Sequence, residues 1–564
     1  MHASQVQKNL IEALVCALEA LTSRTPSKNL PPSLKIELEP PKDPKHGDLT
    51  SNIAMRLAKS FSLPSIKLAS SIKDELKERL KKGSLARVIS KVDISPPGFI
   101  NFRLKSEFLY SVLSEICKEK EAFGKSRIGK GEKVNIEFVS ANPTGPLTVA
   151  HGRQAAVGDA LARILEFSGY KVTREYFIND VGNQIELLGR SIYTHYLALN
   201  GLKCEFPENG YRGEYIKKLA GDFNKKFEKK LLKDTQDNIG FISEFGVLAI
   251  LKTIKEDLEK FGVSFDTWFS QRKLSGSHVK TVLDKLKAKG YIYTKDGATW
   301  FNSKAFGDEK DRVVIKSDGA FTYLAPDIAY HLDKYKRKFK KLIDIWGPDH
   351  HGYIRRLRGS MEAFGYDKEN LSIRIVQLAT LLRGGTVLSM STRKGEFITL
   401  REVIDEVGRD VAKFFFLMRK LDSHLDFDLE VAKESSLDNP VYYIQYAHAR
   451  IASILEFSKK LGAKLASTPF DASRLAQPEE INLLRTLYQF SHAVGVSAKM
   501  LEPYKIIEFL NELAKAFHSF YTKHRVVLED DLALTRARLE LVKGIKIVLA
   551  NGLRLLGISF PERM

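Results

Sequence analysis

Cysteine is scarce in this chain of 564 residues. Cys16, Cys117 and Cys204 are the three present, widely separated and without Cys-x-x-Cys spacing. An odd number of scattered cysteines forms neither a disulfide framework nor a zinc knuckle. We therefore expect buried thiols in a reducing compartment and no structural metal.

Long apolar runs are also missing. Nowhere do about 18 apolar residues follow one another, which is the length needed to span a bilayer. The N-terminal stretch mixes Leu10, Leu14 and Leu18 with Glu12 and Glu19. This spacing is typical of an amphipathic helix and not of a signal peptide. The sequence therefore predicts a cytoplasmic protein with no membrane partner.

Basic residues, in contrast, are abundant. Lys and Arg total 89 against 69 Asp and Glu, a formal net charge of +20. Hydrophobic residues make up 43% and charged residues 28%, which excludes a disordered chain. At about 150 residues per domain, the length suggests about four domains. The charge favours a polyanionic partner such as nucleic acid, and the alternative is a basic surface that serves solubility.

Hydrophobic periodicity divides the chain into three parts. The pattern of the first part predicts a small α+β unit, which opens with a helix and a Pro-rich stretch. Further helices are expected there at 52–61 and 66–82, and strands at 88–94 and 98–102. From about residue 439 nearly everything has helical period, which predicts an all-α bundle. One apolar stripe there comprises Ile506, Phe509, Leu510, Leu513, Phe517 and Phe520.

The middle part opens on a strand, a breaker-rich loop, a helix and a second strand. The strands are expected at 134–139 and 171–178, the loop at 141–146 and the helix at 152–167. This is a βαβ unit, and further strands are expected at 342–346 and 373–377. The fold class predicted is therefore α/β, with a Rossmann-like parallel sheet that binds a nucleotide.

Three basic clusters stand out, at 77–82, 225–233 and 334–341. The last holds six cations and no acid. We interpret each cluster as a solvated helix face. Together they are the predicted place for phosphate contacts if the partner is RNA.

Two loops carry candidate chemistry. The first ends at His151, where the predicted helix begins and its N–H groups attract anions. Pro143 and Gly145 fix a tight turn there, and the alternative role of His151 is that of a helix cap. The second, at 381–395, is flanked by glycines and bears several cations. It is expected either to close on a triphosphate or to form an ordinary basic hairpin.

These loops and several other motifs resemble the arginyl-tRNA synthetase family of class I aminoacyl-tRNA synthetases, along essentially the whole chain. The stretch ending in Thr148-Val149-Ala150-His151 resembles the family's "HIGH" motif, and Ser389-Met390-Ser391-Thr392-Arg393 its "KMSKS" loop. Further matching segments lie at 46–48, 97–102, 179–184, 207–215, 346–352 and 438–450.

Both signature motifs depart from the family pattern. One histidine and one glycine are missing from the first, and both lysines are missing from the second. Arg393, Lys394 and Arg383 remain as possible cation donors. Which of them replaces the lysines is left open.

The resemblance implies ATP-dependent attachment of L-arginine to its cognate tRNA through an arginyl-adenylate, with release of AMP and pyrophosphate. It implies that Mg²⁺ accompanies the ATP and that the arginyl group is esterified to the 2′-hydroxyl of the terminal adenosine. It also implies that tRNA must be bound before arginine is activated, and that the protein is a monomer. The alternatives are a non-catalytic tRNA-binding paralogue and a class I synthetase for another amino acid. Pyrophosphate exchange with arginine, lysine and glutamate separates these readings.

The resemblance also implies a domain division: an additional N-terminal domain contacting the tRNA elbow at 1–125, a catalytic domain at 126–435 with a connective insertion at roughly 190–310, and an anticodon-binding bundle at 436–564.

Site residues follow from the same resemblance. The catalytic set is Thr148, His151, Arg393 and Lys394. ATP is expected at Pro143, Gly145, Thr148, His151, Gly347, Asp349, His350, Met390 and Ser391. Arginine, whose planar cation suits carboxylates, is expected at Glu137, Ser140, Asn142, Asp180, Gln184, Tyr323 and Asp327. The tRNA is expected at Tyr442, Tyr446 and Arg450. The spacing of Tyr442, Tyr443 and Tyr446 allows some of these rings to stack on unpaired anticodon bases, with packing between bundle helices as the alternative. The adjacent His350 and His351 lack metal-ligand spacing.

Overall fold

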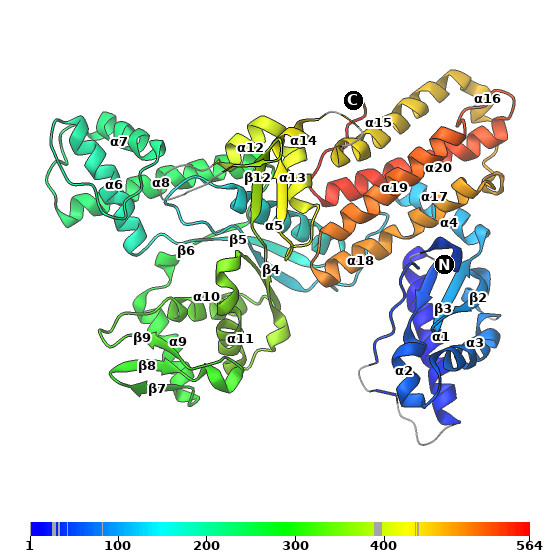
Figure 1. Cartoon of the computed structure of the whole chain (residues 1–564), viewed down its shortest axis with the longest axis horizontal. Helices are drawn as coiled ribbons and strands as arrows, with labels where there is room; N and C mark the ends of the chain where they lie inside the picture. Colours follow the sequence, from blue (N-terminus) through cyan, green and yellow to red (C-terminus); the bar gives the residue numbers. More distant parts are fainter. Residues whose placement is uncertain are drawn as a thin grey trace.

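The computed structural model of the chain describes residues 2–24, 30–31, 34–41, 43–81, 83–388, 398–434, 436 and 439–564. Within these residues no helix is both long and apolar enough to cross a bilayer. Figure 1 shows an elongated molecule in which a central sheet connects two lobes to a helical bundle and a separate N-terminal unit.

The N-terminal unit packs three helices on a small antiparallel sheet. The helices are α1 (Ala3–Ser23), α2 (Ile53–Phe61) and α3 (Ser65–Leu80); the strands are β1 (Leu49–Ser51), β2 (Ile89–Ser95) and β3 (Phe99–Leu104), in the order β1-β3-β2. Leu10, Leu14 and Leu18 of α1 are fully buried, as the amphipathic pattern predicts. The predicted α+β unit is confirmed.

The central sheet is parallel throughout, with the order β11-β10-β4-β5-β6. Its strands are β4 (Lys133–Glu137), β5 (Lys171–Ile178), β6 (Thr267–Ser270), β10 (Lys341–Trp346) and β11 (Leu371–Ile375). Helix α5 (Val149–Phe167) connects β4 to β5, which confirms the predicted βαβ unit. The chain leaves β4 toward β5 on one side and later adds β10 on the other. In open parallel sheets ligands bind outside the carboxyl ends of the strands at such a switch point.

Two lobes are inserted between β5 and β11 (Figure 1). One is helical, with α6 (Asn183–Leu199), α7 (Glu214–Phe227) and α8 (Gln236–Lys260). The other has a core of its own around α9 (Gly276–Ala288), α10 (Leu324–Lys336) and α11 (Ile354–Ala363), and carries the antiparallel sheet β7 (Ile292–Lys295), β8 (Ala298–Phe301) and β9 (Arg312–Ile315).

A third small sheet follows the second lobe. Its strands are β12 (Ala379–Arg383), β13 (Thr386–Val387) and β14 (Leu425–Asp428), accompanied by α12 (Leu400–Val407), α13 (Arg409–Leu417) and α14 (Leu429–Lys433). Gly384 and Gly385 turn the β12–β13 hairpin at positive φ, and both donate their N–H groups to Asp428, at 3.1 and 2.7 Å. The hairpin reading of this segment therefore holds for its described residues.

The C-terminal part is the predicted bundle, made of α15 (Pro440–Ser458), α16 (Gly462–Ala466), α17 (Pro478–Tyr488), α18 (Phe490–Met500), α19 (Tyr504–Lys523) and α20 (Leu532–Leu555). All six members of the predicted apolar stripe on α19 are buried. Helix α4 (Ser106–Glu119), which follows the N-terminal sheet, packs against α17 and α20. An ion pair of 2.8 Å between Asp48 and Arg485 adds a second link between these parts.

A buried lysine connects four segments of the chain. Lys413 of α13 donates its ammonium to Asp159 of α5 at 3.1 Å and to the carbonyl oxygens of Gly262 and Gly557, at 3.1 and 3.3 Å. Gly262 follows α8 and Gly557 follows α20. A buried ammonium needs such partners. This side chain therefore couples α5 and α13 to the helical lobe and to the C-terminal bundle.

The cysteines only partly follow the sequence prediction. All three are free; Cys16 and Cys117 are half-buried, whereas Cys204 is exposed. Burial raises the pKa of the Cys117 thiol to about 12, which makes it inert. The expectation of buried thiols is wrong for Cys204, because it lies in the loop between α6 and α7 and has no core to enter.

Candidate functional site

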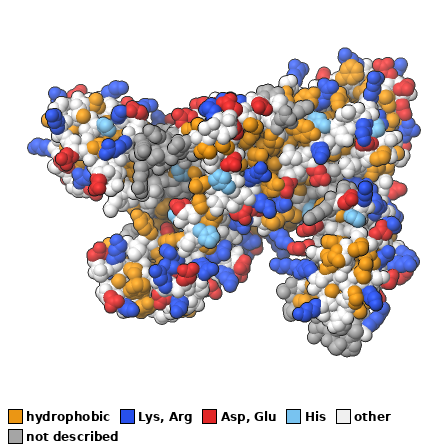
Figure 2. All heavy atoms as spheres, viewed as in Figure 1, with side chains coloured by type: hydrophobic (Ala, Val, Ile, Leu, Met, Phe, Trp, Pro, Cys, Tyr) orange, Lys and Arg blue, Asp and Glu red, His pale blue; other side chains and the backbone are white. Residues whose placement is uncertain are grey.

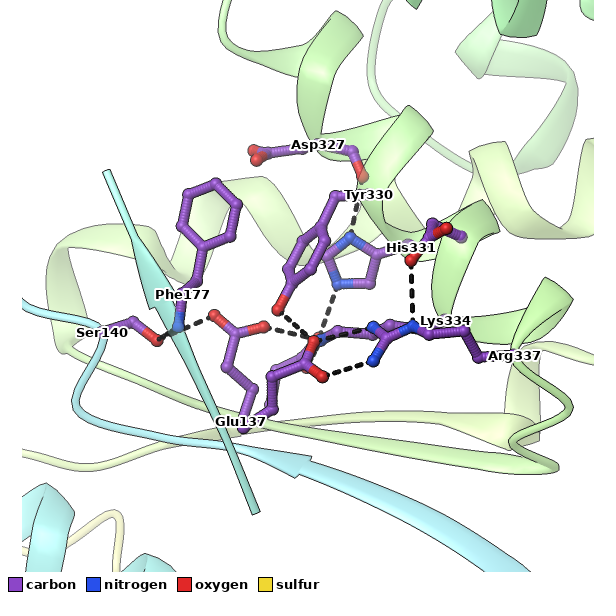
Figure 3. Close-up of polar contacts among 11 residues, drawn as sticks. Glu137, Ser140, Phe177, Asp327, Tyr330, His331, Lys334 and Arg337 are labelled. Carbon is purple, nitrogen blue, oxygen red and sulfur yellow. Dashed lines mark hydrogen bonds and ion pairs between the residues drawn. The ribbon is translucent and has the colours of Figure 1, made fainter. Parts of the chain in front are cut away.

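A sharp turn directly after β4 shapes one side of the site. Val139 and Ser140 adopt positive φ, 67° and 39°, which side-chain-bearing residues seldom do. The turn lets the Ser140 hydroxyl donate to Glu137 Oε1 at 3.0 Å and accept from the Phe177 N–H at 3.0 Å (Figure 3). Ser140 therefore orients Glu137, the last residue of β4, and anchors it to β5.

His151 lies in the first turn of α5 and forms a capping box with Thr148. The Thr148 N–H donates to His151 Nδ1 at 3.1 Å, so Nδ1 is the acceptor and the ring hydrogen belongs on Nε2. Burial lowers the pKa of His151 to about 4, so the ring is neutral near pH 7. His151 can offer one N–H from Nε2 at the helix start, but no charge.

Pro143 and Gly145 form the loop before this helix. Pro143 is buried, and the Tyr215 hydroxyl of α7 donates to the carbonyl oxygen of Thr144 at 2.8 Å. A Cβ atom at Gly145 would lie 3.3 Å from that hydroxyl. The helical lobe therefore contacts the loop directly through Tyr215, and this close contact leaves little room for a side chain at Gly145.

Asn142 connects the loop to α6. Its side chain donates to Gln184 Oε1 at 2.7 Å and accepts from Asn179 Nδ2 at 3.1 Å. Glu137, Ser140, Asn142 and Gln184 thus meet at the carboxyl edge of β4 and β5. Asp180 differs, because its carboxylate accepts from the Ser270 hydroxyl at 2.6 Å and lies 3.6 Å from Arg272 Nε. It fastens the end of β6.

Gly347, Asp349 and His350 follow β10 at the same edge of the sheet. A Cβ atom at Gly347 would come within 2.7 Å of Asp349 Oδ1, so a larger residue there would displace the exposed Asp349 side chain. Asp349 and His350 are exposed and lie 3.4 Å apart as an ion pair, with the His350 ring beside Trp346. Their position at the switch point is suited to a nucleotide.

Asp327 and Tyr323 come from the start of α10. Asp327 is half-buried in the first turn, and burial raises the pKa of its carboxyl to about 6, although His331 and Tyr353 oppose the shift. Tyr323 immediately precedes α10, and its side chain is 77% exposed. The structure thus places these two members of the predicted arginine set in different environments.

A buried charge cluster beneath Glu137 was missed by the sequence reading. Lys334 of α10 is 0% exposed and donates to Glu137 Oε2 at 2.6 Å and to Asp344 Oδ1 at 2.9 Å. Arg337 binds Glu175 in a bidentate pair at 2.5 and 2.8 Å. The remaining members are His331 and Tyr330 (Figure 3).

The prediction of a solvated basic face at 334–341 is therefore wrong for Lys334 and Arg337. Their side chains turn inward to neutralise Glu137 at the end of β4, Asp344 within β10 and Glu175 within β5. A signal was present in the sequence: Tyr330, Lys334 and Arg337 have i, i+4, i+7 spacing on one helix face, and Asp344 interrupts an otherwise apolar strand.

The second signature loop falls outside the described residues, so no structure is given for Met390, Ser391, Arg393 or Lys394. Arg383, the other possible cation donor, is described. It forms a bidentate pair with Glu406 at 2.6 and 3.0 Å and a further contact to Glu430 at 2.9 Å. Both pairs hold Arg383 in the hairpin.

Tyr442, Tyr446 and Arg450 lie on one stripe of α15. The rings of Tyr442 and Tyr446 are nearly parallel, 6.1 Å apart, and the ring of His518 from α19 continues the stack at 6.0 Å. Arg450 is exposed and donates to the Tyr521 hydroxyl at 2.7 Å. His518 and Tyr521 were missed, since neither belongs to a motif. Tyr442 and Tyr446 are half-buried, so each ring packs within the bundle and also has one edge open to solvent.

One group of described residues has ligand atoms close enough together for a metal ion, namely His2, Glu115 and Glu119, all within 4.8 Å. His2 Nδ1 lies 3.1 Å from Glu115 and 3.8 Å from Glu119. This group joins α1 to α4 in the N-terminal region, apart from the sheet edge that carries the site.

Family models and relatives match the chain over nearly its full length. An "Arginyl tRNA synthetase N terminal domain" matches residues 8–104, a "tRNA synthetases class I (R), catalytic domain" matches 112–422, and a "DALR anticodon binding domain" matches 444–564. Curated proteins named "Arginine--tRNA ligase" from Citrifermentans bemidjiense and Listeria monocytogenes are each 47% identical, over 94% of this chain and 95% and 94% of their own.

A solved arginyl-tRNA synthetase of Thermus thermophilus has the same fold, with a TM-score of 0.76, 23% identity, and coverage of 99% of this chain and 100% of that one. The parallel sheet, the helix-start histidine and the matched catalytic domain define a class I aminoacyl-tRNA synthetase. Within that class the chain belongs to the arginyl-tRNA synthetase family, and it is an enzyme of the arginine–tRNA ligase type.

Proposed function

We propose that the chain charges its cognate tRNA with L-arginine in two steps at the carboxyl edge of β4, β5 and β10. First, a carboxylate oxygen of arginine attacks the α-phosphorus of ATP, and the bond to the β-phosphate oxygen breaks to release pyrophosphate. The 2′-hydroxyl of the terminal adenosine then attacks the arginyl carbonyl, and AMP leaves. The observation that carries this proposal is that β4 ends at Glu137, that the loop after it leads into the start of α5, and that α10, which carries Asp327, is bonded to Glu137 through Lys334.

The first step needs positioning and charge stabilisation more than a general base. In this proposal the start of α5 binds ATP, with the Nε2–H of His151 donating to a phosphate and Thr148 holding that ring. Pro143 and Gly145 shape the loop. Gly347, Asp349 and His350 bind the nucleotide from β10, and Met390, Ser391, Arg393 and Lys394 act from the second loop. Mg²⁺ arrives on the triphosphate oxygens, since it usually retains water and substrate phosphate ligands.

Arginine is read by two carboxylates on separate elements. Glu137 acts from the end of β4, with the Ser140 hydroxyl bonded to its Oε1, and Asp327 acts from α10. Asn142 and Gln184 line the open side as a hydrogen-bonded pair. Asp180 and Tyr323 take outer positions: Asp180 steadies the end of β6, and Tyr323 is free to close on the substrate.

The rest of the chain serves the tRNA. We assign the elbow contact to residues 1–125, the chemistry to 126–435 with its insertion at about 190–310, and the anticodon to 436–564. Tyr442, Tyr446 and Arg450 offer rings and a cation to unpaired bases. The protein acts as a cytoplasmic monomer without a structural metal.

Pyrophosphate exchange with ATP and arginine, in the presence of tRNA, tests this proposal. We expect exchange by the wild-type chain, and a loss of about 100-fold in kcat in His151→Ala, because one donor to the developing charge is removed. The matched control is His424→Ala, since His424 is exposed and contacts Thr380 and Asp426 in the third small sheet. Unchanged exchange in His151→Ala contradicts the role of His151. Absence of wild-type exchange favours a non-catalytic paralogue, and exchange with lysine or glutamate favours another amino acid.

A further inference from the structure

Glu137 is held from two sides before any substrate arrives. The Ser140 hydroxyl donates to Oε1 at 3.0 Å, and the Lys334 ammonium donates to Oε2 at 2.6 Å. The carboxylate is 7% exposed and Lys334 is 0% exposed. A guanidinium usually pairs with a carboxylate through two parallel hydrogen bonds, which need both oxygens. Each carboxylate oxygen can accept more than one hydrogen bond, so Ser140 and Lys334 fix the plane of the Glu137 carboxylate without blocking it.

Lys334 is itself fixed in place. Its ammonium also donates to Asp344 Oδ1 at 2.9 Å and lies 4.5 Å from the centroid of the Tyr330 ring. Asp344 in turn contacts His331 Nε2 through Oδ2 at 2.9 Å, and His331 Nδ1 faces the Asp327 carbonyl oxygen at 2.8 Å. One chain of contacts therefore runs from the Glu137 carboxylate through Lys334, Asp344 and His331 to the backbone of Asp327. Burial alone would lower the pKa of Lys334, but Asp344, Glu137 and Glu175 outweigh it and keep the ammonium charged.

We propose that Lys334 is a positioning residue for arginine recognition: its bond to Glu137 Oε2, together with that of Ser140 to Oε1, fixes the carboxylate plane with which the substrate guanidinium must align. This inference rests on the arginine-binding role proposed for Glu137. A carboxylate held in a fixed plane favours a planar cation with several N–H groups over a compact ammonium. Without Lys334 the Glu137 carboxylate is free to rotate and loses that constraint.

The test is Lys334→Ala, assayed by pyrophosphate exchange with and without n-propylamine, which replaces the deleted atoms. We expect the KM for arginine to rise about tenfold or more, as for loss of one charge-assisted contact, with the KM for ATP nearly unchanged. Propylamine should restore the arginine KM in a dose-dependent way, whereas n-propanol, of similar shape but uncharged, should not. Lys336→Ala is the matched control, because Lys336 is exposed on the same helix.

A second variant guards against misfolding. Lys334→Met with Asp344→Asn removes one buried charge of each sign, so the net charge of Glu137, Lys334 and Asp344 stays the same. It should fold, as followed by thermal melting, and should show the same rise in arginine KM. An unchanged arginine KM in either folded variant, or equal rescue by propylamine and propanol, overturns the positioning role. Failure of the proposed function has a different signature, since the wild-type chain would then show no exchange with arginine.

Discussion

Asp327 and Glu137 carry the same charge in different settings. Glu137 has a buried ammonium against one oxygen at 2.6 Å. Asp327 has no lysine or arginine within ion-pair distance among the described residues, and burial raises the pKa of its carboxyl to about 6. Asp327 is therefore expected to change its charge near pH 6, within a range that the folded protein tolerates.

Arginine affinity should fall in mild acid. A guanidinium binds the ionised form of Asp327, so binding is complete well above pH 6 and weakens as pH falls through about 6, where the carboxyl takes up a proton. We expect the KM for arginine to rise nearly tenfold per pH unit below that point. Pyrophosphate exchange between pH 5 and 8 measures this, with the KM for ATP as the internal comparison.

His151 should leave that profile undisturbed, because its ring remains neutral above pH 5. In Asp327→Asn the low-pH rise in arginine KM should disappear, while the KM at pH 8 should already be high. A wild-type arginine KM that is constant from pH 5 to 8 would contradict the role of Asp327.

At this scale the sequence predicts carboxylates better than their counter-ions. Glu137 and Asp327 stand in motifs, whereas Lys334 stands among six cations that look alike in sequence. Which lysine turns inward depends on Glu137 of β4, which lies far from it along the chain, as well as on the neighbouring β10. Burial of a charge is decided by these tertiary contacts, and no local pattern contains them.

The contact between α5 and the end of β4 depends on a glycine. A Cβ atom at Gly158 would lie 2.1 Å from the Phe138 ring, and Phe138 is itself buried against Phe265. Phe138 lies immediately after Glu137, so helix and strand approach closely at the site. This close approach lets the helix start and the carboxylate share one edge.

Gly158→Ala should therefore lower the free energy of unfolding by about 1–3 kcal/mol, because the added methyl group must displace a locked ring. Gly221→Ala in α7 is the matched control: nothing lies within 4 Å of the new Cβ, and alanine should stabilise that helix by up to about 1 kcal/mol. Denaturant unfolding measures both. Equal stability of the two variants would contradict the packing described.

Helices and strands with a strong hydrophobic periodicity could be predicted from the sequence, whereas those without one could not. The apolar β4, β5 and β10 and the stripe on α19 follow their patterns closely. Strands β7 and β8 were not predicted, because most of their residues are only half-buried or exposed and present no apolar alternation. These strands nevertheless form, because β7, β8 and β9 pair with one another in an antiparallel sheet.

The net charge of +20 belongs to the whole molecule. Figure 2 shows Lys and Arg side chains spread over the N-terminal unit, the lobes and the bundle on the face drawn. A long polyanion can therefore contact several parts of the protein at once. Buried cations such as Lys334 and Lys413 add to the total charge without being available to that partner.

Binding of tRNA should weaken steeply with salt, by about 1,000-fold or more between 50 and 200 mM if six or more phosphates are contacted. Arg450→Ala should reduce affinity, and should reduce the salt slope by about one if its partner is a phosphate. Lys252→Ala, an exposed cation on α8 at the opposite side of the molecule, is the comparison (Figure 1). Filter binding over a salt series measures both slopes. Identical affinity in Arg450→Ala and the wild-type chain would contradict a tRNA contact there.

Lys413 has a consequence for the order in which the protein matures during synthesis. One of its acceptors, the carbonyl oxygen of Gly557, lies 144 residues later in the chain. Domains generally fold as units while translation proceeds. The catalytic domain can fold early, but this ammonium must wait with one partner missing until the end of α20 has left the ribosome. In a nascent chain this lysine can thus join the catalytic domain to the bundle only when the bundle itself is complete.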